Sequence, residues 1–110
     1  MTLIRSGNLL AAIPPELSEE QVHTLATAGA ARVERIVSRG QASPAGFWYD
    51  QDQPEWVALL QGAAALEYAD GTVQDLQAGD WVLIPAHVRH RVLRTSCEPA
   101  AVWLAVFLPG

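Results

Sequence analysis

The sequence has 110 residues, half of them apolar, and a formal net charge of −5. This length supports one hydrophobic core, and the apolar content indicates a packed globule rather than a disordered chain. The acidic balance excludes the basic surface on which nucleic-acid binding depends, so no nucleic-acid partner is expected.

The cysteine content and the first residues set the expected compartment. Cys97 is the only cysteine, which excludes an internal disulfide and a zinc site built on several thiolates. The uninterrupted apolar run before the prolines at 14 and 15 extends only from Leu9 to Ile13, too short for a signal-peptide core or a membrane span. We therefore expect a cytoplasmic protein that does not associate with membranes.

The first predicted element is a short helix that follows those two prolines. Ser18 has the residue type of an N-cap, two acidic residues follow it, and Gln21 stands at the capping-box position. The helix is expected to reach about Thr27 and to stop at Gly29. Residues 1–29 are thus predicted to form an N-terminal extension whose helix lies outside the sheet.

From residue 30 onward the apolar residues alternate with a period of two, which indicates β-strands. The segment 41–54 is rich in Gly, Pro, Asp and Gln and predicts a loop. Asp70-Gly71 is a strong hairpin signal because both residues tolerate positive φ. Short strands separated by turns favour an all-β barrel or sandwich over a parallel βαβ fold, and residues 30–110 are expected to form it. The expected strands are 32–39, 55–60, 63–68, 72–76, 81–84, 88–93 and 101–108.

Two ionisable side chains are candidates for inward faces, His90 by the alternation of its strand and Glu55 although both faces of its strand are apolar. Arg89 and Arg91 are expected to face water because burying an unpaired charge is costly, so His90 between them faces the core or a cavity. Glu55 begins a strand that contains no other charge. A carboxylate and an imidazole that reach one cavity are two ligands of a mononuclear metal site or an acid–base pair. The plainer alternative stays open, with a hydrogen-bonded core histidine and a glutamate that only caps a strand end.

The segment Gly79–His90 resembles the second sequence motif of the cupins. That motif has a Gly, five residues, a Pro, one residue, a Gly-like position, two residues and a His, and Pro85 and His90 match it. The resemblance implies that His90 is a metal-binding residue. His87 stands at the Gly-like position, and because His tolerates positive φ it is expected to be a turn residue at the barrel mouth, with an extra ligand or proton shuttle as the alternative.

The segment Glu55–Gly62 is similar to the end of the first cupin motif, a Glu followed by six residues and a Gly. The resemblance implies that Glu55 is the metal-binding Glu of that motif. It covers about residues 30–108 and implies an all-β fold, a cupin-type jelly-roll barrel. Such barrels are often dimeric and carry their ligand site inside.

The opening of the first cupin motif, His-x-His, is missing from this sequence. Counting back from the motif Glu places its two positions at Trp48 and Asp50, or at Tyr49 and Gln51. Asp50 could supply an oxygen ligand in place of a His, and Gln51 a weaker one. Trp48 or Tyr49 could instead close off a dry, metal-free pocket.

Two functions remain on this basis. The first is a small-molecule-binding cupin in which Glu55, His90 and either Asp50 or Gln51 hold a divalent ion such as Fe, Mn, Ni or Zn. The resemblance then implies a dioxygenase, an isomerase or a decarboxylase, and whether the protein is an enzyme is left open. The second is a metal-free, non-catalytic module that binds a ligand or dimerises. The expected partners are a small molecule and, because the strand 101–108 is apolar on both faces, a second copy in a homodimer.

Overall fold

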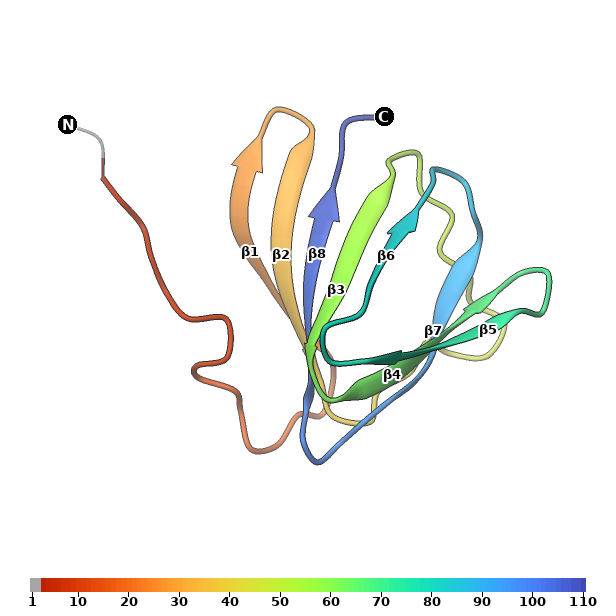
Figure 1. The fold of residues 1–110 in the computed structure, drawn as a ribbon, viewed down its shortest axis with the longest axis horizontal. Coiled ribbons are helices and arrows are strands. Elements are labelled where there is room, and N and C mark those ends of the chain that lie inside the picture. Colours follow the sequence, from red (N-terminus) through yellow and green to blue (C-terminus); the bar gives the residue numbers. More distant parts are fainter. Residues whose placement is uncertain (1–2) are drawn as a thin grey trace.

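The computed structural model describes residues 3–110, and this part of the chain contains eight β-strands and no α-helix (Figure 1). None of it is a helix long and apolar enough to cross a membrane. The strands are β1 (Gln21–Ala28), β2 (Ala31–Ser38), β3 (Glu55–Gln61), β4 (Ala63–Tyr68), β5 (Val73–Gln77), β6 (Trp81–Ile84), β7 (His90–Thr95) and β8 (Ala101–Phe107).

The strands form two antiparallel sheets, which confirms the predicted all-β class. The larger sheet has the order β1-β2-β8-β3-β6, and the smaller one has the order β5-β4-β7. Figure 1 shows the smaller sheet folding back beside β3 and β6, so that the two sheets enclose a common interior. Because β8 lies at the centre of the larger sheet, its inward side chains contribute to the floor of that interior.

The predicted N-terminal helix is wrong, because residues 21–28 form the edge strand β1. β1 pairs antiparallel with β2, from Gln21 opposite Val37 to Ala28 opposite Ala31, and Gly29 at φ 57° makes the turn between them. The capping signals favoured a helix locally. The ladder to β2 supplies hydrogen bonds and packing that an eight-residue helix cannot obtain on its own.

The segment before β1 is tied to the outer face of the larger sheet. The guanidinium of Arg35 on β2 is buried and donates hydrogen bonds to the main-chain carbonyls of Leu9, at 3.1 Å, and Ala11, at 2.6 Å. Figure 1 shows the chain beyond this anchor projecting away from the strands. The anchored segment then leads into Glu20, whose side chain reaches the interior of the barrel.

Two turns expected from the sequence are present. The hairpin between β4 and β5 turns at Asp70-Gly71, where Gly71 has φ 91° and Asp70 accepts a hydrogen bond from the amide of Thr72 at 2.9 Å. His87 adopts φ 64°, the left-handed conformation expected at the Gly-like position of the second motif. This turn sets the direction in which β7, and therefore His90, enters the smaller sheet.

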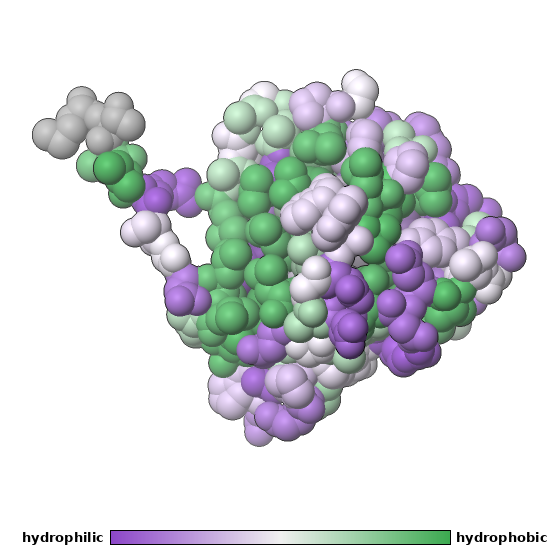
Figure 2. Space-filling view, in the orientation of Figure 1, coloured by the Kyte–Doolittle hydropathy of each residue, from purple (hydrophilic) through white to green (hydrophobic). Residues whose placement is uncertain are grey.

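The hydrophobic core lies between the two sheets and confirms the inward face of the last strand. Its buried members are Val57, Leu59, Ala64, Leu66, Leu76, Ile84, Ala101, Trp103, Ala105 and Phe107. The other face of the larger sheet is also apolar and is partly open to solvent. On β6, Trp81 and Leu83 are exposed, and Trp81 stacks on Trp56 of β3. Figure 2 shows apolar side chains spread over the larger sheet in this view.

Candidate functional site

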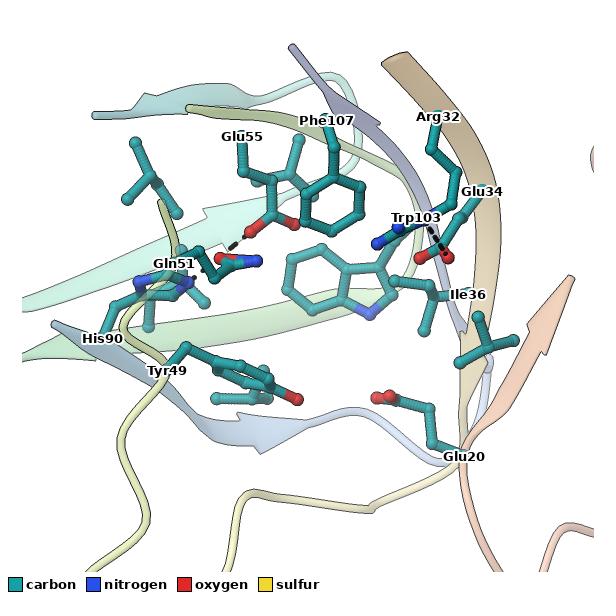
Figure 3. Close-up of a pocket in the computed structure, with 15 residues that line it drawn as sticks. Glu20, Arg32, Glu34, Ile36, Tyr49, Gln51, Glu55, His90, Trp103 and Phe107 are labelled. Atoms are coloured by element: carbon teal, nitrogen blue, oxygen red, sulfur yellow. Dashed lines mark hydrogen bonds and ion pairs between the residues drawn. The ribbon is translucent and has the colours of Figure 1, made fainter. Parts of the chain in front are cut away.

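A cavity of about 250 Å³ opens between the two sheets. Its walls are mostly apolar, and its polar side chains come from β2, β3, β7, the loop before β3 and the residue before β1 (Figure 3). The lining residues are Glu20, Val22, Arg32, Glu34, Ile36, Tyr49, Gln51, Glu55, Val57, Leu66, Ile84, His90, Val92, Trp103 and Phe107.

His90 is held rigidly at one end of this cavity. It begins β7 opposite Tyr68 of β4, and its main chain also exchanges hydrogen bonds with Tyr49 in the loop before β3. The rings of Tyr49 and His90 are stacked, with centroids 5.4 Å apart. Nδ1 of His90 lies 2.8 Å from the carbonyl oxygen of Val88, and because a carbonyl only accepts, Nδ1 carries the proton. Nε2 therefore faces the cavity, with a lone pair when the ring is neutral and with a proton when the ring is charged.

Glu55 faces Nε2 of His90 from the larger sheet. It opens β3 opposite Ile84 of β6 and Phe107 of β8, which turns its side chain inward. Its Oε1 lies 3.5 Å from Nε2 of His90, and the two side chains are only 12 % and 6 % exposed. Burial alone lowers the pKa of His90, but the Glu55 carboxylate and the Val88 carbonyl outweigh it and raise that pKa above the usual value.

The two oxygen-bearing residues proposed in place of the missing His-x-His point in different directions. Gln51 lines the cavity, and Figure 3 shows its amide beside Glu55 and His90. Asp50 does not line it, because its carboxylate lies 2.8 Å from Nδ1 of His87 on the exposed rim of the barrel. The structure thus brings together Glu55, His90 and Gln51. Within residues 3–110, no group of three His, Cys, Asp or Glu side chains is placed to hold a metal ion.

Several polar residues of the cavity were missed from the sequence. Arg32 and Glu34 share the inward face of β2, with Nε of Arg32 2.8 Å from Oε2 of Glu34 and the guanidinium 4.3 Å from the centroid of the Phe107 ring. The alternation of the predicted strand 32–39 already placed these two side chains on one face. Glu20 was missed because it was assigned to the helix. Its carboxylate accepts a hydrogen bond from Ser38 at 3.1 Å.

The side of the cavity away from His90 is also acidic. Burial raises the pKa of Glu20, the hydrogen bond from Ser38 opposes this rise, and repulsion from Glu34 and Glu55 adds to it. The pKa of Tyr49 is raised by burial and then by the charges of Glu20 and Glu55. Figure 3 shows the Tyr49 hydroxyl pointing toward Glu20, with Trp103 between them and Glu55. Three carboxylates therefore act on one small volume.

Comparisons with known proteins agree with this architecture. The family model for the cupin domain matches residues 34–107. A crystal structure from Ralstonia eutropha, provisionally named a mannose-6-phosphate isomerase, is 42 % identical, covers 97 % of this chain and 100 % of its own, and superposes with a TM-score of 0.93. A cupin superfamily protein from Desulfitobacterium hafniense is 18 % identical over 98 % of this chain and 94 % of its own, with a TM-score of 0.79, and shows the fold alone. No curated protein matches the chain.

Proposed function

Because the chain belongs to the cupin family, we propose that its barrel cavity binds a small organic molecule beside a divalent cation held by Glu55, His90 and Gln51. A concave, mostly apolar site with a few convergent polar groups is the usual form of a small-molecule site. The apolar walls would bury the body of the ligand. The polar groups at the two ends would fix its orientation.

One observation supports a bound cation at this end of the cavity. Nε2 of His90 lies 3.5 Å from Oε1 of Glu55 in a buried setting, and Nδ1 faces the Val88 carbonyl, so Nε2 is the ring atom that a cation in the cavity would meet. A buried carboxylate oxygen and imidazole nitrogen this close need a positive charge between them, and a divalent ion can supply it in place of a proton. The hydrogen bond from Nδ1 to Val88 is also the outer contact that orients a metal-binding histidine in other proteins.

The donor set fits a divalent ion. Two ligands bound at about 2.0–2.2 Å in a tetrahedral arrangement lie about 3.4 Å apart, close to the separation found here. An imidazole nitrogen and a carboxylate oxygen suit Zn, Mn, Fe and Ni, and the Gln51 amide oxygen would be a third, weaker ligand. A divalent ion bound there would supply Lewis-acid polarisation of a ligand oxygen.

The chain's own residues would position the ligand around that end of the cavity. The Trp103 and Phe107 rings offer apolar faces, and Tyr49 offers a hydroxyl near Glu20. The family analogy leaves dioxygenase, isomerase and decarboxylase activities as candidates. The provisional name of the Ralstonia eutropha protein makes isomerisation the first reaction to assay.

A metal-free binding module is the second candidate function. Its support is the raised pKa of His90, since a protonated imidazole would satisfy the Glu55 carboxylate without any metal. In that case the Glu55–His90 pair is an ion pair that shapes one end of the cavity, and the ligand is held without a cation.

Calorimetric titration with Mn²⁺, Fe²⁺, Ni²⁺ and Zn²⁺ separates the two candidates. The metal site predicts saturable binding of at least one ion, which Glu55→Gln weakens by at least roughly tenfold because it removes a charged ligand and keeps its shape. Glu67→Gln is the matched control, since Glu67 pairs with Arg91 outside the cavity. Absence of binding, or equal loss in both variants, would leave the metal-free module.

A further inference from the structure

The charges that line the cavity are unbalanced. Glu20, Glu34 and Glu55 face it, whereas Arg32 is its only guanidinium. That guanidinium is paired with a carboxylate, because its Nε lies 2.8 Å from Oε2 of Glu34, and its Cζ lies 4.3 Å from the centroid of the Phe107 ring. Because His90 also faces Glu55, each cationic group of the described lining already has a carboxylate partner, and the lining keeps an excess of negative charge.

A phosphorylated ligand needs such a group. Phosphate recognition in proteins depends on guanidinium or ammonium groups, clustered main-chain amides or a bound metal ion that together supply an excess of positive charge. In this cavity a phosphate would instead meet three carboxylates at close range, where repulsion is stronger than in water. A divalent cation at Glu55 and His90 would cancel the two excess negative charges of the lining and would create no excess of positive charge.

The acidic character extends to the end opposite His90. Burial raises the pKa values of Glu20 and Tyr49, and the charge of Glu55 raises both further. The carboxylates therefore act on one shared space. The Trp103 ring crosses this space in Figure 3. Aromatic faces are attractive to cationic and C–H groups and unattractive to anions.

We infer that the cavity accepts a small, unphosphorylated molecule that offers N–H or O–H donors to Glu20, and that it rejects sugar phosphates. This inference rests on the proposed small-molecule site and assigns its ligand class. The donors could belong to an organic amine or to a neutral hydroxylated compound. The name of the similar Ralstonia eutropha protein includes a sugar phosphate, but we do not expect this cavity to bind one.

A matched set of probes tests the charge preference. Benzylamine, benzyl alcohol and benzyl phosphate share one apolar body and carry a cationic, a neutral and an anionic polar group. Binding is followed by the NMR resonance of the Trp103 indole N–H, assigned with Trp103→Phe. We expect benzylamine or benzyl alcohol to bind at least about tenfold more tightly than benzyl phosphate. Tighter binding of the amine identifies an organic cation as the ligand, and equal or tighter binding of the alcohol identifies a neutral hydroxylated one.

Two outcomes overturn the inference in distinguishable ways. Benzyl phosphate binding as tightly as the other probes, or turnover of mannose 6-phosphate, contradicts the charge argument and leaves the small-molecule site standing. Failure of all three probes to bind contradicts the small-molecule site itself, and the ligand class fails with it.

A pair of variants tests the cause. Glu34→Gln removes the partner of Arg32 and frees its guanidinium, so the affinity for benzyl phosphate should rise several-fold. The control is Glu67→Gln, which breaks the ion pair with Arg91 outside the cavity and should leave that affinity unchanged. An unchanged affinity in Glu34→Gln, with its fold intact by circular dichroism, would contradict the role given to the paired arginine.

Discussion

Nε2 of His90 and Oε1 of Glu55 face each other across 3.5 Å inside the barrel, from two different sheets. The main chain fixes both partners, since Glu55 is in register with Phe107 and His90 is in register with Tyr68. The fold therefore brings the two side chains to the same end of the cavity. Any positive charge held at this point also ties the two sheets together.

Replacing His90 with Ala should remove bound metal while the β-sheet spectrum in circular dichroism is retained. The variant loses the imidazole ligand and its hydrogen bond to Val88, but the strand pairing of β7 uses only main-chain atoms. Metal content is measured by mass spectrometry after metal loading and desalting. Metal content equal to that of the unmodified protein would rule out the site proposed here.

His87→Gly is the matched control for that variant. His87 has φ 64°, which Gly adopts without strain, and it lies outside the cavity. Its contact with Asp50 joins two exposed side chains, of which 68 % and 49 % are accessible, so its loss should cost little. We expect metal content and melting temperature close to those of the unmodified protein. A clear loss of metal would make His87 a ligand.

The glycine that ends the first motif should be far less replaceable than the hairpin glycine. Both have positive φ, 85° at Gly62 and 91° at Gly71. A Cβ at Gly62 would lie 2.6 Å from Oγ of Ser96 and 2.7 Å from the carbonyl oxygen of Ala100, whereas a Cβ at Gly71 would meet open space. Gly62→Ala should therefore lower the free energy of unfolding by about 1–3 kcal/mol more than Gly71→Ala does. Equal losses in urea unfolding would contradict this packing.

The burial of Glu20 predicts a pH-dependent gain of stability in Glu20→Gln. Its pKa in the folded protein is raised above the ordinary value of 4.5, so ionised Glu20 destabilises the fold at pH values above the raised pKa. Below pH 4.5 the group is protonated in both states and contributes nothing. The variant should melt a few degrees higher at neutral pH in the presence of a chelator, with the gain vanishing below that value.

Glu19→Gln provides the comparison for this prediction, because Glu19 is exposed and lies outside the barrel cavity. It should show no such pH-dependent gain. A lower melting temperature for Glu20→Gln at neutral pH, or the same gain at every pH, would contradict the assignment of Glu20 as a buried, repelled carboxylate.

The homodimer stays a prediction, and the outer face of the larger sheet is the surface on which we expect a second copy to pack. Trp81 and Leu83 on β6 are 61 % and 51 % exposed, and a symmetric dimer would set this face against itself. Leu83→Glu should convert a dimer into a monomer in sedimentation, whereas Gln77→Glu on the smaller sheet should not. A monomeric unmodified protein would contradict the prediction.

Most strands could be predicted from the sequence because their signals are local. The alternation of 81–84 and the Asp70-Gly71 turn act over a few residues, and the structure has β6 and the hairpin at those places. β1 could not be predicted, because its structure is determined by pairing with β2 and not by the capping signals in its own sequence. Long-range pairing outweighs local propensity at this strand.

The residues of the candidate site on strands could be predicted from the sequence, whereas those in loops could not. Alternation indicated that His90 faces inward, whereas both faces of the strand 55–60 are apolar and Glu55 was indicated by its motif position. Asp50 and Gln51 lie in a loop without a period, and only the structure separates the one at the rim from the one in the cavity. Whether the Glu20 side chain enters the cavity depends on where β1 starts. Its place in the cavity could not be inferred once a helix was expected there.

The most direct test of the account is the metal content of the protein purified without a His tag or chelator, measured by mass spectrometry beside Glu55→Ala. A cation site at Glu55 and His90 predicts near-stoichiometric transition metal in the unmodified protein and its loss in Glu55→Ala. A protein that holds no metal even after incubation with Fe, Mn, Ni and Zn would contradict the cation site and would leave the Glu55–His90 pair as a proton-bridged ion pair.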